Sequence, residues 1–237
     1  MYFNENFRDE QGMSARAAAT AKSERVEWAQ GFLLDYQSGF TQGTVGVGVD
    51  AHSLSSIKID SGRGKYGNGL FDQTSDGRGD DTQTEVGGAV KFRVSDTVLK
   101  YGQQFVASPV FATDDSRLLP EVATGTLITS KEIKGLELNA GRFTAESRKS
   151  DEGRDSGGLK SINVLGGSYQ FTENFKGALY ASDVEDVLKK QYINLNYNLP
   201  LAEDQALNFD FNIYRTKYDT GSVAALDYGG DGKTDAR

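Results

Sequence analysis

The 237-residue chain has no cysteine, one histidine and only three prolines. Without cysteine it can form neither disulfides nor thiolate zinc sites. Because His52 is the single histidine, clusters of histidines that hold transition metals are excluded as well. We therefore expect no metal and no cofactor. The chain also lacks any run that approaches the ~20 consecutive apolar residues of a membrane-spanning helix.

Glycine and aromatic residues are abundant, with 28 Gly, 13 Phe and 11 Tyr. This mixture suits curved, closely packed sheets with an aromatic belt where membrane meets water. The negative mean hydropathy does not argue against a membrane location, because a barrel strand needs apolar residues on one face only. The net charge of −8 argues against a nucleic-acid partner.

Apolar and polar residues alternate strictly in several segments, and LNFDFNIY, from Leu207 to Tyr214, shows this without a break. Leu, Phe, Phe and Ile share one face of the predicted strand, and Asn, Asp, Asn and Tyr share the other. In a soluble β-sandwich the apolar face would be the core, whereas in a transmembrane barrel it would face lipid. The connections between the strands help to decide between the two.

Alternation predicts eleven strands and no helix. The strands are expected over 1–7, 26–37, 44–51, 85–94, 97–102, 123–130, 136–143, 162–171, 175–185, 191–199 and 206–214. Short connections, such as Ser95-Asp96, alternate along the chain with long polar ones, such as 60–84 and 144–161. Short turns at one end and long loops at the other are typical of outer-membrane barrels, and strands of roughly 9–11 residues fit a tilted bilayer span.

The polar faces are rich in Gly and Asn, whereas an ordinary soluble surface would be rich in Lys, Glu and Thr. Gly46 and Gly48 oppose a row of valines, and Asn194, Asn196 and Asn198 oppose Ile, Leu and Tyr. A water-filled lumen explains both, since Gly thins the wall and Asn lines the channel. The predicted fold class is therefore all-β, a transmembrane antiparallel β-barrel embedded in lipid. A secreted β-sandwich that binds a partner is the alternative.

Five stretches resemble the porin D (OprD) family of Gram-negative outer-membrane channels. They are VEWAQGFLLDYQSGFTQGTVGVGVDA (26–51), KIDSGRGKYGNG (58–69), SPVFATDDSRLLPEVATG (108–125), GLELNAGRF (135–143) and QALNFDFNIYRT (205–216). The resemblance implies a monomeric, eighteen-stranded barrel in the outer membrane, narrowed by an inward-folded third loop. It also implies substrate-selective passive uptake of small solutes, such as carboxylates or basic amino acids, without enzymatic activity.

The eleven predicted strands are fewer than such a barrel needs, and bacterial single-chain barrels have an even number. We therefore expect residues 1–237 to form a single incomplete β-barrel domain, with 105–122 as the inward-folded constriction loop. The start, MYFN, lacks the basic and apolar regions of a signal peptide and has the pattern of a strand. Because an open sheet would leave unpaired edges in lipid, the chain is expected to be a fragment of a pore.

The resemblance places solute selection in a narrow eyelet. An arginine in a Ser-Arg-Leu stretch of the inward loop matches Arg117, and an acidic loop residue matches Asp115. The family has a row of arginines on the facing wall; Arg25 matches one of them, whereas Glu5 stands where another is often found. These charges imply a transverse field in which carboxylates bind guanidinium groups and exchange easily.

Three more residues are candidates for solute binding. By alternation Lys91 and Arg93 lie on the polar face of their strand, either as further lumen charges or as wall charges paired with Asp or Glu. Arg142 matches a variable position of the family next to an aromatic residue. Strict alternation turns Arg142 toward lipid, so it can reach the lumen only through a bulge at Gly141 or from above the bilayer.

Two rival sites compete with the channel interpretation. A hydrolase borne on the barrel would need His52, which has no evident serine partner, and no catalytic residue is assigned. The stretch DYGGDGKTD (227–235) resembles half of a calcium loop but lacks the final bidentate Glu, and a polar loop is the simpler interpretation.

Cysteine labelling on intact cells tests the topology, since the chain has no native cysteine. The long loops are expected outside the cell and the short turns in the periplasm. In the full-length protein, a cysteine at Asp76 should react with a membrane-impermeant maleimide, and one at Asp96 should react only after lysis. Labelling in the reverse order would overturn this topology.

Overall fold

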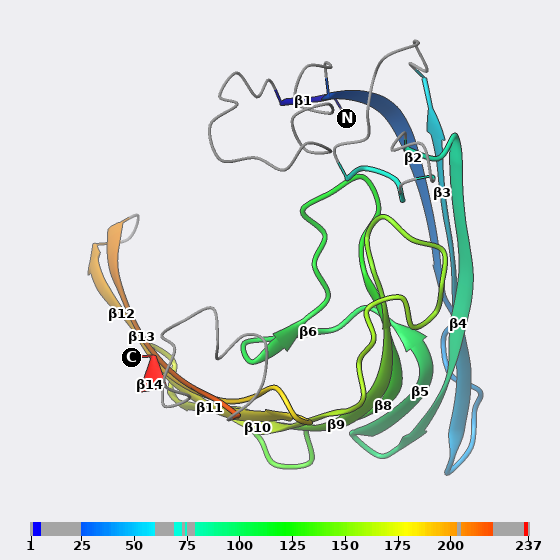
Figure 1. Cartoon of the computed structure of the whole chain (residues 1–237). Coiled ribbons are helices and arrows are strands. Elements are labelled where there is room, and N and C mark those ends of the chain that lie inside the picture. Colours follow the sequence, from blue (N-terminus) through cyan, green and yellow to red (C-terminus); the bar gives the residue numbers. More distant parts are fainter. Residues whose placement is uncertain are drawn as a thin grey trace.

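In the part of the chain that the structure describes, twelve strands form one continuous antiparallel sheet that curves through an open arc (Figure 1). The computed structural model describes residues 2–5, 25–59, 69–72, 74, 79–202, 205–219 and 235–236. Strands follow one another across the sheet in chain order, except that β6 and β7 form a separate two-stranded hairpin. The described residues contain no α-helix with the length and apolar character of a membrane span.

The fourteen strands that the structure describes belong to the sheet or to the hairpin. The sheet contains β1 (Tyr2–Glu5), β2 (Arg25–Gln37), β3 (Gly46–Lys58), β4 (Thr82–Val94), β5 (Thr97–Gln104), β8 (Val122–Ser130), β9 (Leu136–Ser147), β10 (Ile162–Thr172), β11 (Phe175–Val184), β12 (Leu188–Ala202), β13 (Gln205–Tyr218) and β14 (Asp235–Ala236), and the hairpin contains β6 (Ala107–Ser108) and β7 (Phe111–Ala112).

All eleven strands predicted from the sequence are confirmed, with shifted ends. Three two-residue strands, β6, β7 and β14, were not predicted because two residues are too few for an alternating pattern. The strand predicted over 44–51 instead runs over Gly46–Lys58. Its second half was missed because Ser53 and Ser55 stand at positions where the alternation requires apolar residues.

The concave side of the sheet carries the loop between β5 and β8 (Figure 1). Val106 and Val110 of this loop pack in one buried cluster with Tyr180 of β11 and Tyr192 of β12. Tyr192 therefore points to the inner side, and so do the alternate residues that follow it on β12. The polar face of β12, which carries Asn194, Asn196 and Asn198, is the inner face, as the barrel interpretation requires.

Amide side chains cross-link the polar faces of β12 and β13. Asn194 Nδ2 donates to Asp210 Oδ1 at 2.6 Å, and Asn196 Nδ2 donates to Asn208 Oδ1 at 3.0 Å. Cross-strand pairs of this kind stabilise an antiparallel sheet by roughly 0.2–1 kcal/mol each. The Asn-rich face is therefore an inner wall whose side chains bond to one another.

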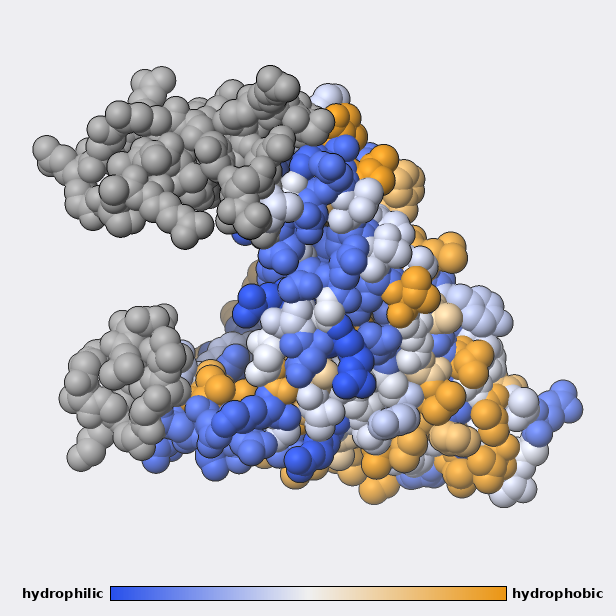
Figure 2. All heavy atoms as spheres, turned by 45° about the vertical axis from the view of Figure 1, so that its right-hand side comes forward, coloured by the Kyte–Doolittle hydropathy of each residue, from blue (hydrophilic) through white to orange (hydrophobic). Residues whose placement is uncertain are grey.

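The convex side is apolar. Leu207, Phe209, Phe211 and Ile213 of β13 are all exposed, and Figure 2 shows apolar residues gathered along the outer margin of the molecule. A contiguous apolar face of this size is unusual for a soluble monomer and is the normal lipid-facing surface of a membrane barrel. The β-sandwich alternative is therefore wrong, because a sandwich would cover this face with a second sheet.

Aromatic side chains form a row on the convex side next to the Glu173-Asn174 turn. Ring centroids of Tyr169 and Phe171 lie 5.0 Å apart, as do those of Phe171 and Phe175, and Tyr197 continues the row 6.4 Å from Phe175. Such rows mark the level where the apolar band meets water in outer-membrane barrels. The strand ends that are joined by short connections, such as Glu173-Asn174, are called the turn end of the sheet. The opposite strand ends, which are joined by the long connections, are called the loop end.

Charge placed on the convex side should be costly. We predict that Phe211→Lys, near the middle of β13, lowers the free energy of unfolding in lipid by about 2–4 kcal/mol, as expected for a lysine near the bilayer midplane. Asn196→Lys on the concave side should change it by only about 0.5 kcal/mol. Urea titration of the full-length barrel in vesicles, followed by heat-modifiable gel mobility, measures both. Equal losses would show that the two faces are wrongly assigned.

Candidate functional site in the concave side

The loop of residues 105–121 is attached to the inner wall at both of its ends. On one side the Ser182 hydroxyl of β11 donates to the Val110 carbonyl at 3.2 Å, and the ring of Phe111 lies 5.2 Å from that of Phe143. On the other side Leu119 packs in a buried cluster with Leu54 of β3. The apolar content of the loop is thus explained by packing on the inner wall.

A second segment, from the connection between β3 and β4, also lies on the concave side. Leu70 and Phe71 are buried and pack with Ala29 of β2 and with Leu118 of the loop. The backbone N–H of Leu70 donates to the Glu27 carboxylate at 2.8 Å. This contact could not be predicted from the sequence, because two apolar residues within a long polar stretch show no periodicity.

Arg117 connects these two inward segments. Its Nη1 donates to the carbonyl of Gly69 at 3.0 Å, and its side chain is half-buried. A guanidinium group offers five N–H donors in a fixed plane, so it can bond to more than one segment at once. Arg117 therefore braces the two inward loops against each other.

A pocket of about 480 Å³ lies between the inward loop and β2. Asp115 and Arg117 line it from the loop, Asp35 lines it from β2, and Leu33 and Leu118 supply apolar surface. Family resemblance implied the first two as charges of the eyelet. It missed Asp35, although this residue lies on the polar side of the β2 alternation.

Lysines on the inner wall share a carboxylate nearer the turn end. Asp50 of β3 lies 2.6 Å from Lys91 Nζ of β4 and 2.6 Å from Lys100 Nζ of β5. For Lys91 the structure supports the paired interpretation. Arg93 points to the same side but has no carboxylate partner among the described residues, and its guanidinium carbon lies 4.7 Å from the ring centroid of Phe40.

Arg142 is not brought into this group, and for Arg25 only the backbone is described. Arg142 of β9 is exposed and pairs in regular register with Asn163 and Thr126, so it lies on the convex side. The pairing of β8 with β9 skips Thr144 rather than Gly141, so no bulge turns Arg142 inward. Arg25 begins β2 opposite Glu5 in the strand pairing.

The rival sites gain no support. His52 lies against the ring of Phe105, with centroids 5.2 Å apart, and its Nε2 has no hydrogen-bond partner in the described part of the chain. A hydrolase would need a serine at that nitrogen. Most of the calcium-like stretch, 227–234, lies outside the described residues. Among the residues that are described, no group of three or more His, Cys, Asp or Glu side chains could hold a metal ion.

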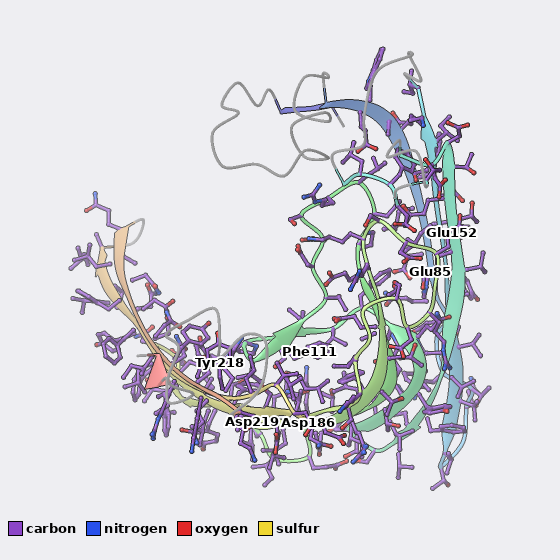
Figure 3. The ribbon with its side chains drawn as sticks, in the orientation of Figure 1. Glu85, Phe111, Glu152, Asp186, Tyr218 and Asp219 are labelled. Atoms are coloured by element: carbon purple, nitrogen blue, oxygen red, sulfur yellow. The ribbon has the colours of Figure 1, made fainter. Side chains whose placement is uncertain are left out.

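The connection between β9 and β10 folds over the loop end of β4 and fastens the inward loop. Gln83 Nε2 donates to the Asp151 carbonyl at 3.0 Å, and the Glu152 carboxylate accepts from the Thr84 N–H at 2.6 Å. Figure 3 accordingly shows Glu152 beside β4, near Glu85 of that strand. From the same connection, Lys149 forms an ion pair with Asp114 of the inward loop.

Hydrogen bonds fix the charge state of Asp114. Lys149 and the Ser116 hydroxyl and N–H all donate to its carboxylate. These bonds lower the pKa of Asp114 to about 2, well below its ordinary range. The bond to Lys149 therefore joins two loops that are far apart in sequence and does so across the physiological pH range.

Comparison with known proteins supports the same architecture. A sequence profile of the outer membrane porin, OprD family, matches residues 1–235. Porin D of Pseudomonas aeruginosa is 44% identical over 221 residues, which are 90% of this chain and 49% of that protein. The crystal structure of a BenF-like porin from Pseudomonas fluorescens Pf-5 superposes with a TM-score of 0.81 at 36% identity, covering 94% of this chain and 57% of that one.

A third relative is OpdK of Pseudomonas aeruginosa, whose structure was solved with vanillate. It superposes with a TM-score of 0.77 at 34% identity and covers 90% of this chain and 56% of its own. This chain thus spans about half the length of the relatives it matches.

The Lys149–Asp114 pair should hold the inward loop at mildly acidic pH. Because the folded pKa of Asp114 is lowered, the stability from this pair is present above the ordinary carboxyl pKa of 3.8 and is lost as pH falls through about 2. Hydrogen exchange of residues 113–117 in the full-length barrel, corrected for intrinsic rates, should therefore be alike at pH 7 and pH 5.

Lys149→Ala should raise this exchange at both pH values. Lys160→Ala is the matched control, because Lys160 pairs with Asp186 in a different part of the molecule. Equal exchange in the wild type and Lys149→Ala would show that the loop is held without this ion pair.

Proposed function

Because the chain belongs to the OprD family of outer membrane porins, we propose that the full-length protein is a channel for the passive uptake of small solutes across the outer membrane of Gram-negative bacteria. The convex apolar face and the inward loops support this proposal. The chain supplies about half of the wall, and the closed barrel is proposed to act as a monomer.

The observation that carries the proposal is the pocket beside the inward loop. There a guanidinium group, Arg117, and two carboxylates, Asp35 and Asp115, surround a space of about 480 Å³. Opposite charges across a narrow space create a transverse field that orients a dipolar solute. A large neutral solute gains nothing from this field, so the pocket favours small charged ones.

Carboxylates and basic amino acids are the proposed solutes. A carboxylate can accept two N–H bonds from a guanidinium group, and near water such a bond exchanges quickly enough for passage. The ammonium groups of a basic amino acid would be attracted by Asp35 and Asp115. The vanillate in the OpdK structure is a carboxylate, which supports this class of solute for a related channel.

The remaining inner cations are proposed to guide solutes to and from the pocket. Lys91 and Arg93 lie on the wall toward the turn end, and Arg25 is proposed as a wall arginine. Arg142 is left out, because it lies on the convex side. Passage forms and breaks no covalent bond, so the proposed function needs no catalytic residue and no cofactor.

Arg117→Ala should weaken carboxylate binding in planar-bilayer recordings of the full-length barrel. We expect about a tenfold loss of apparent affinity, which corresponds to about 1.4 kcal/mol. The loss should shrink as salt is raised, since partly solvated charges act over a Debye length of about 8–10 Å. Arg142→Ala, the same change on the convex side, should leave affinity unchanged.

Asp115→Asn should instead weaken the binding of basic amino acids and spare single carboxylates. If Arg117→Ala changes only the open-channel noise, with anion preference and its salt dependence as in the wild type, Arg117 is a brace between loops. The pocket would then not select solutes.

A further inference from the structure

The connection between β2 and β3, residues 38–45, is the longest at the turn end and leans over the inner face of β3. The Ser38 N–H donates to the Val49 carbonyl and the Thr41 N–H to the Val47 carbonyl, both at 2.9 Å. The Thr41 hydroxyl accepts from the Val47 N–H at 2.9 Å. These bonds fix the path of the connection along the edge of β3.

Two glycines make room for it. A Cβ atom at Gly48 would lie 2.6 Å from the Gly39 carbonyl oxygen and 2.7 Å from Lys91 Cε. A Cβ atom at Gly46 would lie 3.0 Å from Cβ of Phe40. The glycines of this face thus allow a segment of backbone and one aromatic ring to lie on the inner wall, in addition to thinning the wall.

The ring of Phe40 lies beside two cations of β4. The guanidinium carbon of Arg93 is 4.7 Å from the ring centroid, and Lys91 Nζ is 5.2 Å from it. Both distances are within the ≈ 6 Å range of cation–π attraction. Because the ring carries no net charge, it attracts both cations but does not neutralise their positive charge.

The charged residues linked to Phe40 include more cations than anions. Lys91 and Arg93 lie beside the ring, and Asp50 pairs with Lys91 and with Lys100 of β5. Asp50 bonds to the two lysines, which leaves Arg93 without a carboxylate partner in the described part of the chain. This part of the wall is therefore cationic, and Arg93 is its exposed donor.

We propose that Arg93 binds carboxylates at the turn end of the channel, with Lys91 and Lys100 beside it, and that Phe40 is the residue that positions it. The site is separate from the Arg117 pocket, and the proposal rests on the proposed channel function. Phe40 limits the conformations of the guanidinium group, so less entropy is lost when a carboxylate binds. A second weak site near one mouth lets solutes leave stepwise, as conduction requires.

Planar-bilayer recordings of the full-length barrel test this, with benzoate added to one side at a time. Arg93→Gln should weaken block by benzoate added at the turn end about five- to tenfold, and block from the loop end less. Phe40→Leu removes the aromatic face and keeps the net charge, and it should weaken turn-end block about two- to fivefold. Phe40→Trp should preserve the block. Lys134→Gln, an exposed cation at the same end, should not change it.

The outcomes separate the two proposals. If benzoate does not block the wild-type channel from either side, the proposed function fails and this site fails with it. If it blocks the wild type but Arg93→Gln leaves turn-end block unchanged, only the site at Arg93 is wrong. If Arg93→Gln weakens block and Phe40→Leu matches the wild type, Phe40 does not position Arg93.

Discussion

Each backbone N–H and C=O group that lies in a lipid bilayer must find its hydrogen-bond partner within the protein. Hydrocarbon offers no partner for an unpaired N–H or C=O group, so a sheet that spans a membrane must pair each strand with its neighbours. The continuous twelve-stranded sheet meets this demand everywhere except at its two edges. Once the sheet curves, its convex side must be apolar and its concave side is free to be polar, which fixes the alternation of every long strand.

The same constraint moves function to the concave side. The inner wall carries amide ladders, ion pairs and glycines, and it holds three chain segments that leave the sheet. These are the loop of residues 105–121, Leu70 and Phe71, and the connection over Gly46 and Gly48. Apolar anchors fix the first two, and backbone hydrogen bonds fix the third. Charged groups held on such fixed segments keep defined positions on the inner wall.

Alternation placed Lys91 and Arg93 correctly on the inner face, but it did not predict which side chains surround each of them. Lys91 and Arg93 stand two positions apart on the same face, yet Lys91 bonds to Asp50 while Arg93 lies against Phe40. Alternation assigns a face but does not say which neighbouring strand supplies a partner. Arg142 shows the opposite case, since family resemblance suggested the lumen and alternation suggested lipid. The regular pairing of β9 agrees with alternation.

The eleven main strands, the apolar outer face and the family could be read from the amino-acid order alone, because each depends on local periodicity or on residues in a fixed order. The contacts on the concave side became visible only in the folded sheet. The contact of Arg117 with Gly69, the ion pair of Lys149 with Asp114 and the place of Asp35 in the pocket join segments far apart in the chain. No periodicity encodes such contacts, since they arise from how far the sheet curves and where its loops fold back.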